Sequence, residues 1–184
     1  MMFSMCIKTA STEVNRMEAR KMTQRLQKIY KLFLHNNKLV VKEVPDNESD
    51  RITSINNFVK EFIKAGYTQI SIPSPSLILL LKSFFENDFK ILGMKFLYTD
   101  DDMTEEINEM IYRIDGKESD FRQLISRLEE IINENMNEIE NIRVRLNHND
   151  ITIHMNGFIE VDSYGNEYDA LSRVEKIFRR DIHE

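Results

Sequence analysis

Apolar residues recur every three or four positions along much of the chain, a spacing that is typical of amphipathic helices. The first such stretch predicts a helix over residues 12–35, capped by Ser11 or Thr12 and ended by Asn36-Asn37. One side of this helix would be apolar. Its other half would carry six cations, namely Arg16, Arg20, Lys21, Arg25, Lys28 and Lys31.

The same spacing predicts further helices over 50–65, 75–87, 103–114, 118–141 and 167–180. Helix 50–65 is expected to bury one apolar face, made of Ile52, Ile55, Phe58, Val59, Phe62 and Ile63. Ser74 is expected to cap the nearly all-apolar helix that follows it, with Pro75 at its first position. Helix 118–141 would expose an acidic side that includes Glu129, Glu130, Glu134 and Glu138.

Alternating or short apolar runs predict the strands, over 38–44, 68–72, 89–99, 142–146 and a hairpin in 149–162. The strand, helix and strand between 68 and 99 are expected to form a right-handed unit with parallel strands. The predicted class is α+β, with four to five helices packed on a small mixed sheet. A C-terminal antiparallel meander (142–162) would be closed by a helix.

Asn156-Gly157 is the strongest turn signal in the chain, because both positions of a two-residue hairpin turn require residues that tolerate positive φ. Such a turn pairs Met155 with Phe158, and pairs Glu160 and Asp162 with the isoleucines at 153 and 151. His154 would then lie on the opposite face from both carboxylates. Arg143 and Arg145, on the neighbouring strand, are expected to pair with Glu160 and Asp162.

A metal-dependent nuclease or other hydrolase using Asp150, Glu160 and Asp162 is the least favoured reading, because Asp162 stands where a restriction-type core needs lysine. No phosphate-binding loop, dinucleotide-binding turn, HExxH or nucleophile elbow is present. Cys6 is the single cysteine, so neither an internal disulfide nor a cysteine zinc site can form. We therefore expect no catalytic residue, metal, cofactor or small-molecule substrate.

Charge is distributed unevenly along the 184 residues, whose net charge is −6. Residues 1–42 carry nine Lys or Arg and two Glu, whereas the remainder carries 16 basic and 29 acidic residues. We expect a single domain over 1–184 with a basic N-terminal helical arm (1–37). No apolar run approaches the roughly 20 residues of a membrane span, so a cytosolic protein without membrane contact is expected.

These patterns favour a non-enzymatic accessory or regulatory subunit that binds a protein partner or itself. The many Ile and Asn residues suggest an AT-rich gene, and hence a bacterial or phage assembly, including one used in defence. The binding surfaces would be the six cations of 12–35 and the acidic side of 118–141. The alternative is a nucleic-acid-binding regulator that uses the same cations on phosphates, although no aromatic residue lies among them to stack bases.

Overall fold

Seven strands form one sheet in the computed structural model, which describes residues 26–45, 51–98, 101–114, 117–134, 137–163 and 167–182. The order of neighbouring strands is β2-β1-β7-β6-β5-β4, and β3 also pairs with β1. Every pairing is antiparallel. The strands are β1 (Leu26–His35), β2 (Lys38–Glu43), β3 (Thr68–Gln69), β4 (Lys90–Phe96), β5 (Ile139–Leu146), β6 (Asn149–His154) and β7 (Phe158–Ser163).

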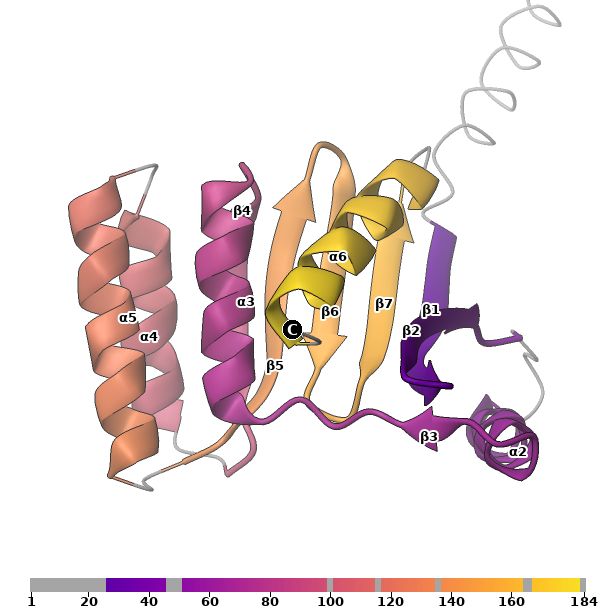
Figure 1. Ribbon diagram of the computed structural model, residues 1–184. Helices are drawn as coiled ribbons and strands as arrows, with labels where there is room; N and C mark the ends of the chain where they lie inside the picture. The colour runs from indigo at the N-terminus through magenta and orange to yellow at the C-terminus, as the bar shows by residue number, and fades with distance from the viewer. Residues whose placement is uncertain are drawn as a thin grey trace, which may run out of the picture.

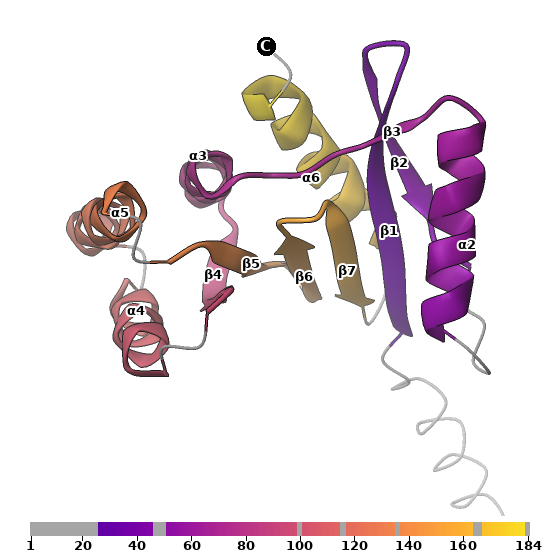
Figure 2. The ribbon, with the colours of Figure 1, turned by 90° about the horizontal axis from the view of Figure 1, so that it is seen from below.

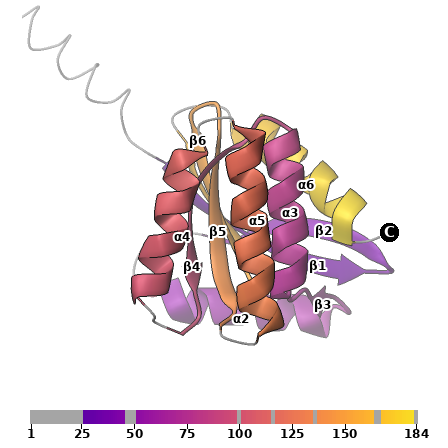
Figure 3. The same cartoon turned by 90° about the vertical axis from the view of Figure 1, so that its left-hand side faces the viewer.

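Within these described ranges five helices lie around the sheet: α2 (Arg51–Lys64), α3 (Ser74–Glu86), α4 (Asp101–Arg113), α5 (Glu118–Asn133) and α6 (Glu167–Ile182). Helices α3 and α6 cover one face of the sheet (Figure 1). Helices α4 and α5 lie side by side at the β4 end (Figures 2 and 3). The α+β class is confirmed. Helix α3, which the sequence showed to be nearly all apolar, packs centrally, with four of its side chains fully buried (Leu77, Leu80, Leu81 and Phe84).

The parallel unit predicted between 68 and 99 is wrong. Strand β3 pairs with β1, and β4 pairs with β5, so the two strands do not meet. The chain instead runs from β3 to α3 past the end of the β6–β7 hairpin (Figure 1). The backbone N–H of Ile72 donates a 2.7 Å hydrogen bond to the carbonyl of Met155, which holds this connection against the hairpin turn.

The predicted helix 12–35 is wrong over 26–35, where the chain forms β1; the earlier part lies outside the described residues. Asn36 and Asn37 have φ values of 50° and 57°, as the two central residues of a type I′ hairpin turn do. They join β1 to β2 rather than ending a helix. The C-terminal part of the expected helical arm (26–37) therefore belongs to the sheet.

Two further boundaries differ from the prediction. Helix α5 ends at Asn133, so Glu138 lies beyond the helix and Ile139 begins β5. Pro73, not Ser74, occupies the cap position of α3. The Ser74 hydroxyl instead accepts a 2.9 Å hydrogen bond from the backbone N–H of Ile139, which ties the start of α3 to β5.

The outer edge of β4 is covered by a side chain from α4. Asn108 accepts a 3.0 Å hydrogen bond from the Met94 N–H and donates a 3.3 Å bond to the Met94 carbonyl. A side-chain amide thus takes the place of a further strand at this position and removes an exposed pairing edge.

Candidate functional site

The face of β5, β6 and β7 opposite α3 and α6 carries the polar residues that the sequence singled out around the C-terminal hairpin. Figure 2 shows none of the described helices over this face, with α4 beside β4 and α2 beside β1. The strand register places side chains in two rows across it. Arg143, Thr152 and Glu160 form one row, and Arg145, Asp150 and Asp162 form the next. We call these residues, together with His154, the open face.

The predicted register of the β6–β7 hairpin is wrong by one residue. Ile153 pairs with Ile159 and Thr152 with Glu160. The turn consists of Met155, Asn156 and Gly157, and the Gly157 N–H donates a 2.9 Å hydrogen bond to the His154 carbonyl. Only Gly157 of these has positive φ, at 77°, as expected for the last residue of a three-residue hairpin loop. A shift of one residue moves every side chain to the other face.

The corrected register brings His154 to the same face as the carboxylates. Its Nε2 lies 3.5 Å from Oε1 of Glu160, and both side chains are partly buried. Contact with His154 and the charge of Arg51 hold the pKa of Glu160 below its usual value. The expectation that His154 points away from Glu160 and Asp162 is therefore wrong.

Asp150 is the buried acid of the open face, with its side chain only 10% exposed. Arg145 binds it through two guanidinium nitrogens, Nε to Oδ1 and Nη2 to Oδ2, the latter at 2.9 Å. Arg143 lies 3.4 Å from Oδ2. The arginines thus contact Asp150 rather than the predicted Glu160 and Asp162. Hydrogen bonding to Arg145 is the main cause that lowers the pKa of Asp150.

Asp150→Asn is expected to lower the free energy of unfolding by about 1–3 kcal/mol near neutral pH, because hydrogen bonds to a charged acceptor are lost. The lowered pKa makes this stabilisation complete above the ordinary pKa of an aspartate, and it disappears as the pH falls through the folded value. Urea unfolding at neutral and acidic pH checks this. The unfolding curves of the wild type and the variant should converge in acid, whereas exposed Asp169→Asn should change little at either pH. A stability difference between the wild type and Asp150→Asn that persists in acid would contradict the conclusion that the ionised carboxylate of Asp150 is stabilised by the arginines.

Lys31 does not lie on an exposed basic surface. It is fully buried, and its ammonium donates to the carbonyl of Asn156 and, at 3.5 Å, to that of Ile70. The ring of Phe158 lies 4.7 Å from the nitrogen. Burial lowers the pKa of Lys31 to about 8. Lys31 therefore joins the connection between β3 and α3 to the hairpin turn, which is a structural role.

Lys28 is the other described member of the six predicted cations, and it lies on strand β1. Its ammonium is 3.5 Å from Glu43 and 5.5 Å from the centre of the Tyr168 ring. Lys28 and Lys31 therefore do not share the predicted helical face. The remaining four (Arg16, Arg20, Lys21 and Arg25) lie outside the described residues.

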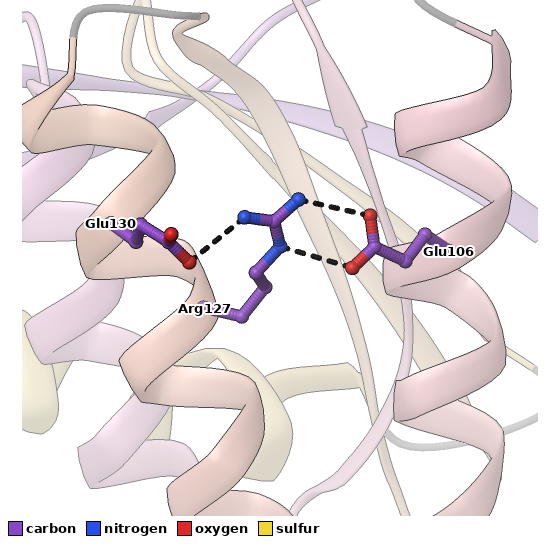
Figure 4. Close-up of polar contacts among 3 residues, drawn as sticks. All are labelled: Glu106, Arg127 and Glu130. Carbon is purple, nitrogen blue, oxygen red and sulfur yellow. Dashed lines mark hydrogen bonds and ion pairs between the residues drawn. The ribbon is translucent and has the colours of Figure 1, made fainter.

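Helices α4 and α5 together form a strongly acidic surface, with nine acidic and three basic residues in their two ranges. We call this pair, together with Glu134 at the C-terminal end of α5, the acidic hairpin. Arg127 joins the helices, contacting both carboxylate oxygens of Glu106 at 3.0 and 3.2 Å and Glu130 at 2.8 Å (Figure 4). These two glutamates raise the pKa of Arg127. Of the other predicted acids, Glu129 pairs with Lys82 at 2.9 Å, and Glu134 is exposed at the end of α5.

Helix α2 buries less of its apolar side than the sequence suggested. None of its residues is fully buried, and Ile52 and Ile63 are 75% and 45% exposed. Phe58 and Phe62 form the inward contact, with ring centres 6.2 and 5.1 Å from that of Phe33. The predicted inner face is therefore only partly correct.

Metal and ligand chemistry receives little support from the described residues. Within them, no three or more His, Cys, Asp or Glu side chains are grouped as a metal ion would require. A small pocket of about 50 Å³ lies between β1, the end of β2 and the start of α2, lined in part by Gln27, Glu43 and Arg51. A pocket of this size is far below the roughly 300 Å³ of the smallest usual small-molecule sites.

Comparison with known proteins gave no match to a family model, to a curated protein or to a solved structure. Across the part of the chain that the structure describes, none of the helices is long and apolar enough to cross a bilayer.

Proposed function

We propose that the protein is a non-enzymatic accessory or regulatory subunit that acts by binding a basic surface of another protein through the acidic hairpin. The proposed setting is a cytosolic assembly of a bacterium or phage, including one used in defence. The observation that carries the proposal is the excess of nine acidic over three basic residues on two adjoining helices.

The packing of the acidic hairpin supports this role. Ile107, Leu124 and Leu128 are fully buried beneath it, and Arg127 connects its two helices. The backbone of packed helices is already ordered, so it loses little freedom when a partner binds, which favours affinity. Tyr112 is 88% exposed on α4, and an exposed tyrosine within a charged surface is a frequent contact residue in interfaces.

Affinity capture from a lysate of the source cells tests the proposal. The tagged wild type is compared with a Glu105→Gln/Glu109→Gln/Glu134→Gln variant, whose three sites are exposed on the acidic hairpin. The control is Glu61→Gln/Asp169→Asn, which removes exposed acids from α2 and α6. The proposal predicts a partner that is retained at about 50 mM salt, is lost at about 500 mM, and is lost with the hairpin variant alone.

Equal capture by the wild type, the hairpin variant and the control would contradict the proposal. Capture of a nucleic acid by all three would instead favour a regulator of that class. Of the two described cations from the predicted basic face, Lys31 is buried and Lys28 lies beside Glu43, so the pair does not form an exposed surface for phosphates.

A further inference from the structure

The charges of the open face change sign from one side of β6 to the other. Strand β5 contributes Arg143 and Arg145, which are 52% and 45% exposed. Strand β7 contributes Glu160 and Asp162, and β6 lies between these strands. The register places Arg143 level with Glu160 and Arg145 level with Asp162. Two cations therefore lie along β5 and two anions lie along β7, with β6 between them.

This pattern is complementary to itself when two open faces meet. The twofold axis would run parallel to β6 and lie between the two faces. The rotation places β5 of one copy over β7 of the other. It does not shift residues along the strand direction, so each row of one copy faces the same row of the other. Arg143 would then face Glu160 of the second copy, and Arg145 would face its Asp162. Two-fold interfaces of this kind, in which one patch meets the same patch, are the commonest in homo-oligomers.

We propose that the open face is the interface of a homodimer, a self-association separate from the partner binding proposed above. Stacked sheets lie about 10 Å apart, a separation that arginine and glutamate side chains can bridge together. Asp150 holds both guanidinium groups in place, so they lose little freedom when a carboxylate of a second copy approaches.

The balance of charges distinguishes a second copy from other occupants. The open face carries two arginines and three acids (Asp150, Glu160 and Asp162), so its net charge is small and favours neither a polyanion nor a strongly basic protein. Partly exposed ion pairs contribute little each, so the dimer is expected to be weak and sensitive to salt.

Charge reversal tests the proposal, with sedimentation velocity as the measurement. Arg143→Glu and Glu160→Arg are prepared separately, with circular dichroism to confirm folding. Arg122→Glu and Glu118→Arg make the same changes on the exposed surface of α5, away from the open face, and serve as controls. The wild type and both controls should dimerise at about 50 mM salt. Each open-face variant should weaken dimerisation by about tenfold or more, and an equimolar mixture of the two should restore it.

Restoration is the decisive result, because only the mixture can place the glutamate introduced on β5 of one variant opposite the arginine introduced on β7 of the other. A wild type that stays monomeric at low salt would overturn the proposal. A dimer that both open-face variants leave intact, or a mixture that fails to regain dimerisation, would overturn it as well. Failure of the acidic-hairpin capture experiment would leave this result unaffected.

Discussion

Gly157→Ala is expected to lower the free energy of unfolding by about 3–5 kcal/mol, the range of the most damaging single substitutions. The backbone of Gly157 has φ of +77°, which disfavours any residue with a Cβ. A Cβ there would lie 2.5 Å from the carbonyl oxygen of Ile70 and 3.1 Å from Nζ of Lys31. The nearer atom belongs to the backbone, so relief requires movement of the connection between β3 and α3.

Gly66→Ala is the matched control for this prediction, with urea unfolding as the measurement. Gly66 has φ of +85°, and a Cβ built on it meets no atom within 4 Å. The backbone conformation alone should therefore lower stability by about 1–2 kcal/mol. Equal losses in the two variants would show that the close approach of Ile70 does not matter.

The stability difference between the wild type and Lys31→Met is expected to change by about 3 kcal/mol in favour of the wild type as pH rises from about 8 to about 10.5. Burial lowers the pKa of Lys31 to about 8 from the usual 10.5, so over this interval the unfolded chain binds the proton more strongly than the folded chain. Stability of the wild type therefore rises with pH through this residue.

Methionine has a similar length and no titrating group, so subtraction of the variant removes the contribution of other residues to the pH dependence. Urea unfolding at several pH values between about 7 and 11 provides the difference. A constant difference over this interval would show that the ammonium of Lys31 is not destabilised by burial, and that its bonds to the carbonyls of Asn156 and Ile70 offset the loss of water.

The elements that were predicted well are those whose spacing of apolar residues fits only a helix or only a strand. Helices α3, α4 and α6 and strands β2, β4 and β6 fall close to the expected ranges, because each presents one apolar side to the same core. Strand β1 was missed because both its faces are buried, through Tyr30 and Leu32 on one side and Lys31 and Phe33 on the other. Its apolar residues Leu26, Ile29, Tyr30 and Phe33 also lie three or four positions apart, so their spacing did not distinguish a strand from a helix.

The open face was missed for a more local reason. Asn156-Gly157 suits both a two-residue turn and the end of a three-residue turn. The two-residue turn places His154 on the face opposite Glu160, whereas the three-residue turn places both on the same face. The alternation of Ile151, Ile153, Ile159 and Val161 contained the missing information. All four are buried, which only the three-residue turn allows. The contact of Asp150 with Arg145 depends on the resulting packing and could not be read from spacing.

The proposed function depends most directly on where a partner touches the protein, and zero-length carbodiimide coupling measures this in the complex. The reagent joins carboxylates to lysine amines in contact, and mass spectrometry of the coupled peptides identifies each carboxylate. We expect partner lysines to be coupled to Glu105, Glu109, Glu129 and Glu134 of the acidic hairpin. Coupling confined to acids elsewhere, such as Glu61 on α2 and Asp169 on α6, would contradict the proposal that the acidic hairpin is the binding surface.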